Sequence, residues 1–84
     1  MNKINIAAKE MTYTEFMNKA VNATTKEERR LNLLEAFYLA TTLEKEYTRI
    51  YTTTSDVGKW EVCKPMAQAW AARIKKLNQD IDTL

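Results

Sequence analysis

The feature that most constrains the fold of this chain is a long heptad pattern in its C-terminal third. From Ser55 to Leu84, apolar residues recur alternately three and four positions apart, at Trp60, Cys63, Ala67, Trp70, Ile74, Leu77, Ile81 and Leu84. This spacing is typical of a helix that packs lengthwise against another helix. The pattern therefore predicts one long helix, from about residue 56 to 83, and it requires a partner helix of similar length.

A matching pattern lies in the middle of the chain. Residues 26–51 contain neither Gly nor Pro, and apolar residues again alternate at three and four positions: Leu33, Ala36, Ala40, Leu43, Tyr47 and Ile50. If the chain reverses after this helix, in the polar stretch 52–55, the two patterns meet as an antiparallel hairpin. Trp70 then lies opposite Ala40, and large residues face small ones in most layers, as interdigitated helices require.

Pro65 lies inside the C-terminal heptad pattern without shifting it. A proline within a helix removes one backbone hydrogen bond and displaces the carbonyl four residues earlier. Because the heptad places Pro65 on the outer side, we expect a continuous helix that is kinked near Pro65 and bends around its partner. The alternative is a helix that begins at Pro65, a favourable first position. The register of Trp60 favours the continuous helix, in which Trp60 closes the turn end of the core against Ile50.

A third, shorter helix is predicted before the hairpin. Thr12 and Glu15 have the spacing of a capping box, and an apolar face includes Tyr13, Phe16, Met17, Ala20 and Val21. We therefore expect a helix from about residue 13 to 23. Residues 1–11 fit both a strand pattern and a helix pattern, and they are predicted as either a loose arm or a short helix. Both Thr24–Glu27 and Thr25–Glu28 have the spacing of a cap for the helix that follows.

The expected fold is all-α, a three-helix arrangement dominated by the long antiparallel hairpin. The first half of the 26–51 helix is apolar on almost every side, so it must be covered by more than one neighbour. The short N-terminal helix is long enough to lie over the second apolar side, from Leu31 to Tyr38. With 84 residues, the chain suits a single helical domain, and its small size favours a homo-oligomer.

The residues that usually carry catalysis or metal binding are scarce. There is no His, a lone Cys63 cannot anchor a thiolate metal site, and a single Gly excludes a Gly-rich phosphate loop. We therefore expect neither an enzyme nor a protein with a metal or cofactor, and we interpret Cys63 as a core residue. The single cysteine and the lack of a signal-peptide run or membrane-span run favour a cytoplasmic protein that does not enter the membrane.

The first candidate binding group is apolar and aromatic, on the outer sides of the hairpin: Tyr38, Leu39, Tyr51, Val62 and Met66. Aromatic residues and Met are enriched where proteins meet. This group predicts a stoichiometric module that binds another protein, as an inhibitor or adaptor does. Small chains without catalytic residues are typical of phage- or mobile-element-encoded inhibitors and adaptors, a comparison that rests on composition alone.

The second candidate group is basic and gathers at one end of the expected hairpin: Lys26, Arg29, Arg30, Arg73, Lys75 and Lys76, with Tyr13 available for stacking. Cations beside an aromatic ring are typical of phosphate contacts, so the alternative hypothesis is an oligomeric nucleotide-sequestering protein or a nucleic-acid binder. Two observations weigh against it. The formal net charge is only +2, and acidic residues share that end: Glu27, Glu28, Asp80 and Asp82.

Overall fold

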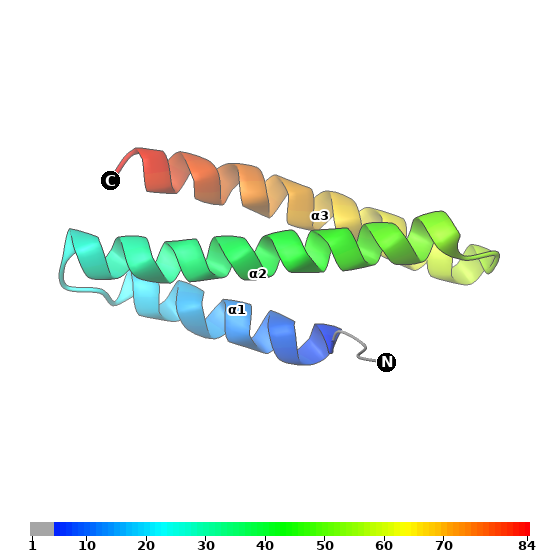
Figure 1. Ribbon diagram of the computed structural model, residues 1–84, viewed down its shortest axis with the longest axis horizontal. Coiled ribbons are helices and arrows are strands. Elements are labelled where there is room, and N and C mark those ends of the chain that lie inside the picture. Colours follow the sequence, from blue (N-terminus) through cyan, green and yellow to red (C-terminus); the bar gives the residue numbers. More distant parts are fainter. Residues whose placement is uncertain (1–4) are drawn as a thin grey trace.

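Three helices in an up-down-up order make up the computed structural model, which describes residues 5–84 (Figure 1). They are α1 (Ile6–Val21), α2 (Lys26–Thr53) and α3 (Val57–Asp82). No strand occurs in this part of the chain. The predicted all-α fold, with a short first helix and a long antiparallel hairpin, is confirmed.

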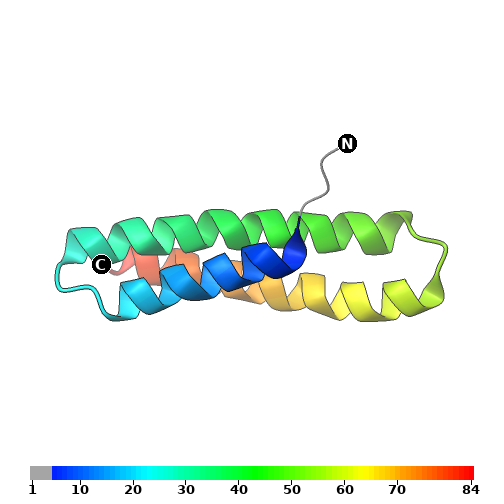
Figure 2. The same cartoon turned by 90° about the horizontal axis from the view of Figure 1, so that it is seen from below.

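Helix α2 packs against both of the other helices, and the view of Figure 1 shows it between them. Figure 2 shows α1 and α3 on the same side of α2, so that α2 forms a ridge along the opposite side of the molecule. The backbones of α1 and α3 meet α2 rather than each other. They are joined across the far side by side chains, where the Tyr13 ring meets the Trp70 ring edge-on with 4.8 Å between centroids.

The core is built mainly from the predicted heptad residues. The buried apolar residues are Ala20, Leu33, Ala36, Leu39, Ala40, Leu43, Tyr47, Ala67, Trp70 and Leu77. In α2 the pattern is buried continuously from Leu33 to Tyr47, because two helices cover it. In α3 burial is restricted to the middle of the pattern, because the α3 backbone packs on α2 alone. Trp70 is 2% exposed and shares the core cluster with Ala40, as expected.

Helix α1 starts about two turns earlier than predicted. It begins at Ile6 because Asn5 caps it, with the Asn5 Oδ1 accepting a hydrogen bond from the Ala8 N–H at 3.0 Å. Of the two alternatives for residues 1–11, a loose arm or a short helix, the structure shows a helix from Ile6 onward, continuous with the rest of α1. Residues 1–4 of that arm lie outside the described residues.

The predicted capping box at Thr12 is also wrong. The Thr12 hydroxyl donates to the Ala8 carbonyl oxygen at 2.9 Å, as a Thr inside a helix can do. A capping arrangement forms instead at the start of α2. There the Thr25 Oγ1 accepts from the Glu28 N–H at 3.1 Å, and the Glu28 carboxylate accepts from the Thr24 N–H at 3.2 Å. The start of α2 is therefore where the sequence pattern predicts it.

The turn between α2 and α3 lies at residues 54–56. Asp56 caps α3, its Oδ1 accepting a hydrogen bond from the Gly58 N–H at 2.9 Å. Helix α3 then continues through Pro65, so the alternative in which the helix begins there is wrong. Pro65 is exposed, in agreement with its predicted position on the outer side. The bend near Pro65 stays a prediction.

The far end of the hairpin projects beyond α1. At about 1.5 Å per residue, α1 is about 24 Å long and α2 about 42 Å. The Tyr47 hydroxyl donates a hydrogen bond to the Glu10 carboxylate at 3.3 Å, which holds the N-terminal part of α1 beside Tyr47. Within residues 5–84, the hairpin beyond Tyr47 therefore consists of two helices only (Figures 1 and 2).

Candidate protein-binding surfaces

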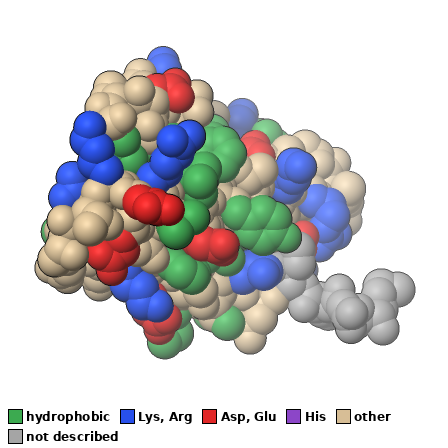
Figure 3. Space-filling model, turned by 60° about the vertical axis from the view of Figure 1, so that its left-hand side comes forward, with side chains coloured by type: hydrophobic (Ala, Val, Ile, Leu, Met, Phe, Trp, Pro, Cys, Tyr) green, Lys and Arg blue, Asp and Glu red, His purple; other side chains and the backbone are tan. Residues whose placement is uncertain are grey.

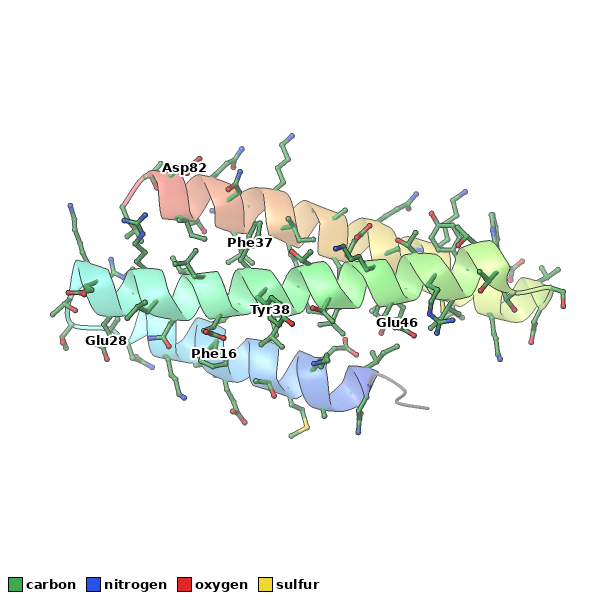
Figure 4. The ribbon with its side chains drawn as sticks, in the orientation of Figure 1. Phe16, Glu28, Phe37, Tyr38, Glu46 and Asp82 are labelled. Atoms are coloured by element: carbon green, nitrogen blue, oxygen red, sulfur yellow. The ribbon has the colours of Figure 1, made fainter. Side chains whose placement is uncertain are left out.

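The structure does not bring the predicted partner-binding residues to one surface. Tyr38 is 65% exposed, and in Figure 4 it lies on the side of α2 that faces the viewer. Leu39 is only 8% exposed, so its assignment to an open surface is corrected. It shares a side of α2 with Glu46, seven residues later, and Figure 4 shows Glu46 on the edge toward α1. Helix α1 therefore covers the side of α2 to which Leu39 belongs.

The other three residues of that group lie nearer the turn. Tyr51 and Met66 are half-buried and pack against the core, whereas Val62 is exposed. Val62 is two positions after Trp60, and two positions turn an α-helix by about 200°, so the two side chains leave α3 on opposite sides. Tyr38 and Val62 thus remain as exposed members of the predicted group, on different helices.

An exposed surface that the sequence analysis missed lies at the free end of the hairpin. The expected core position of Trp60 is wrong, because its side chain lies beyond the end of α1 and is 42% exposed. Val57, Trp60 and Lys64 are spaced three and four positions apart and share one side of α3. We call these three residues the hairpin-end surface. The sequence pattern does not indicate this surface, because the surface depends on where α1 ends along the hairpin.

The hairpin-end surface combines an aromatic ring with a cation and a hollow. The Lys64 Nζ lies 4.5 Å from the centroid of the Trp60 ring, the geometry of a cation–π interaction. Trp60 and Val57 also border a shallow hollow of about 200 Å³ formed with the turn residues Thr54, Ser55 and Asp56. This end therefore offers apolar, cationic and hydrogen-bonding groups within one small area.

A second heptad pattern runs along the outer side of α2, which α1 was expected to cover. Its residues alternate four and three positions apart: Glu27, Leu31, Leu34, Tyr38, Thr41 and Lys45. All of them are exposed except Thr41, which is half-buried. At about 100° per residue, this side is opposite the side that faces α3. Tyr38, one of its residues, lies on the side of α2 that faces the viewer in Figure 4. We call these six residues the outer α2 seam.

The predicted phosphate-binding cations are all exposed, but some already have neighbours. The Arg73 guanidinium lies over the Trp70 ring, 4.3 Å from its centroid, and the Lys76 Nζ bonds the Asp80 carboxylate at 3.0 Å. Tyr13 is half-buried and its ring meets the Trp70 ring edge-on, so part of the Tyr13 ring is already in contact with the core. Arg73 and Lys76 are therefore already engaged in contacts within the protein, which reduces their availability to a phosphate group.

Figure 3 shows the end of the molecule where the N-terminus of α2 and the C-terminus of α3 lie. Blue and red side chains alternate there with green apolar ones, rather than forming one positive patch. A hollow of about 300 Å³ opens at this end, bordered by Met17, Val21 and Leu84 and by one charge of each sign, Arg29 and Asp80. The mixture of charges gives the surface no strong preference for an anion.

Two tyrosines, Tyr13 packed against the core and Tyr47 within it, have raised pKa values. Burial raises the pKa of Tyr13, and the nearby Arg73 partly opposes this effect. Burial also raises the pKa of Tyr47, and Glu10 and Cys63 beside it add to the shift. Cys63 of α3 therefore lies near Tyr47 of α2, across the hairpin. Both tyrosines connect helices, and we assign them a structural role.

Comparisons of the chain with protein-family models, with curated proteins and with solved structures found no match. Among residues 5–84, no three side chains of the usual metal-binding types lie together in a way that would hold an ion. In the same range, no helix has both the length and the apolar character needed to cross a membrane.

Proposed function

We propose that this protein is a non-catalytic module that binds another protein through the free end of its helical hairpin. The observation that supports this proposal is the exposed Trp60 on a hairpin that projects beyond α1. Tryptophan is among the residues that contribute most binding energy at protein interfaces. An inhibitor or an adaptor is the class of protein that such a module represents.

The composition of the hairpin-end surface indicates what it would bind. Val57 and the uncovered part of Trp60 favour an apolar partner surface, because burying them removes apolar area from water. Lys64 beside the ring and the exposed Lys59 favour carboxylates at the edge of that surface. We therefore expect a partner with an apolar patch bordered by acidic residues.

The proposal is tested by capture of partners from a lysate of the native host on immobilised protein, followed by mass spectrometry. We expect a specific partner to be retained by the wild type and lost with Trp60→Ala. The matched control is Met11→Ala, which shortens an exposed apolar side chain on α1, away from the hairpin end. Circular dichroism checks that both variants remain helical. Equal retention by Trp60→Ala and the wild type would contradict the proposal.

The alternative function, binding of a nucleotide or nucleic acid, has weaker support. It depends on exposed cations such as Arg29 and Arg30, which stand among carboxylates at the same end. It predicts retention on heparin at low salt that falls when Arg29 and Arg30 are replaced by Ala, with a smaller salt dependence. Absence of retention at low salt would remove this alternative.

A further inference from the structure

We infer that the outer α2 seam is the contact between two copies of this chain, packed antiparallel about a two-fold axis near residue 36. The seam is exposed along a helix whose other sides are covered by α1 and α3. Its alternate spacing of four and three positions is the one that lets two helices pack along their length. This inference is independent of the function proposed for the hairpin end, since the two surfaces share no residue.

The register follows from the spacing. With the axis near residue 36, Leu34 of each copy faces Tyr38 of the other, and Leu31 faces Thr41 at the next layer on either side. The three apolar residues therefore meet in the centre of the contact. The Thr41 hydroxyl already donates to the Phe37 carbonyl oxygen of its own helix at 2.9 Å. Burial of Thr41 in the contact thus leaves its hydroxyl hydrogen-bonded.

The charges at the two ends of the seam select the antiparallel direction. Glu27 and Lys45 are both exposed and have opposite charges. In the antiparallel register, Glu27 of each copy lies beside Lys45 of the other, so two ion pairs flank the apolar centre. In a parallel register, Glu27 would face Glu27 and Lys45 would face Lys45. Opposite charges at the border of helix pairs favour one orientation over the other.

The shape of the molecule leaves room for the second copy. Because α1 and α3 both lie on the far side of α2 (Figure 2), two α2 ridges can approach without displacing either helix. The α2–α3 turns of the two copies then lie at opposite ends of the antiparallel dimer. With each turn about 18 residues from the axis at about 1.5 Å per residue, the two hairpin-end surfaces are about 54 Å apart.

Cross-linking tests the orientation directly. In a Cys63→Ala background, Glu27→Cys and Lys45→Cys are prepared as separate proteins and joined with a short bis-maleimide, alone and mixed. In the mixture we expect covalent dimers that contain one chain of each variant. Either variant alone should stay uncross-linked, because like positions are about 27 Å apart along the antiparallel pair. Cross-linking of each variant alone, or none in the mixture, would overturn the inference.

Sedimentation equilibrium tests the contact without introduced cysteines or a cross-linker. We expect Leu34→Glu to raise the dimer dissociation constant by at least about tenfold, because it puts two carboxylates in the apolar centre. The matched control is Met11→Glu, which also replaces an exposed apolar side chain by a carboxylate, but on α1. Its dimer dissociation constant should equal that of the wild type. Circular dichroism confirms folding of both. A monomeric wild type, or an unchanged constant for Leu34→Glu, would sink the inference.

Discussion

At the scale of single residues, the two tryptophans of α3 have different surroundings although both belong to the same heptad pattern. Trp70 is enclosed by α2, by the Tyr13 ring and by the Arg73 guanidinium, and its buried indole N–H has no hydrogen-bond partner among residues 5–84. Trp60 packs beyond the reach of α1 and keeps nearly half of its surface in water. The first therefore belongs to the core of the fold, whereas the second remains accessible at the surface.

Tyr47 is the residue that ties α1 to the hairpin, and its hydroxyl should contribute measurably to stability. We expect Tyr47→Phe to lower the free energy of unfolding at neutral pH by about 1 kcal/mol, because the hydrogen bond to Glu10 is lost while the ring remains. Urea denaturation followed by circular dichroism measures the change. The matched control is Tyr38→Phe, which alters an exposed tyrosine and should be close to neutral.

Tyr47→Phe should also change how the free energy of unfolding responds to alkaline pH. Burial, with Glu10 and Cys63 adding to it, raises the pKa of Tyr47 in the folded protein. The folded state then holds this proton more tightly than the unfolded state, so the stabilisation is full below the ordinary tyrosine pKa of about 10 and is lost as pH rises above it. Tyr47→Phe should therefore lose less stability than the wild type between about pH 9 and pH 11. An identical loss in both proteins would contradict this assignment.

At the scale of helices, α2 determines the arrangement, because within residues 5–84 it is the helix whose backbone packs against both others. It is apolar on nearly every side of its first half, and its outer side stays open where α1 does not reach. Helix α3 contacts mainly α2, and it continues through Pro65 despite the hydrogen bond that the proline removes. Each of the two long helices therefore carries one unfavourable feature, an open apolar side in α2 and an internal proline in α3.

Pro65 should reduce the stability of α3. We expect Pro65→Ala to raise the free energy of unfolding by about 1–3 kcal/mol, because Ala restores a backbone N–H that can bond the Glu61 carbonyl and removes the ring that crowds it. Pro65 is exposed, so little core contact is lost. Urea denaturation measures the change, with Gln68→Ala at another exposed position of α3 as a control expected to be nearly neutral. Unchanged or lower stability in Pro65→Ala would show that the bend improves the packing of α3 on α2.

At the scale of the whole molecule, the described chain has a longer three-helix part and a shorter two-helix part along an axis of 47 Å. The three-helix part contains most of the buried residues, from Leu33 to Tyr47 of α2 and the middle of α3. The two-helix part contains the turn and the hairpin-end surface. Stability is therefore expected to be uneven along the hairpin, with the part nearest the turn opening most readily.

Hydrogen exchange followed by mass spectrometry should resolve this difference. We expect backbone amides near the turn, in residues 49–64, to exchange faster than those between Leu33 and Tyr47, because fewer apolar contacts resist local opening there. A bound partner at the hairpin end should slow exchange in the first segment selectively. Equal protection of the two segments would mean that the hairpin opens as one cooperative unit.

The amino-acid sequence by itself determined the helices, the direction of the hairpin and most of the core, because backbone hydrogen bonding is local and the heptad spacing fixes which side of a helix is apolar. Tertiary structure decided which apolar residues stay outside. Helix α2 offers α1 two apolar sides, and α1 buries Leu39 while Leu34 and Tyr38 remain open. The length of α1 likewise leaves Trp60 exposed. Both outcomes depend on how one helix packs on another, which no local pattern encodes.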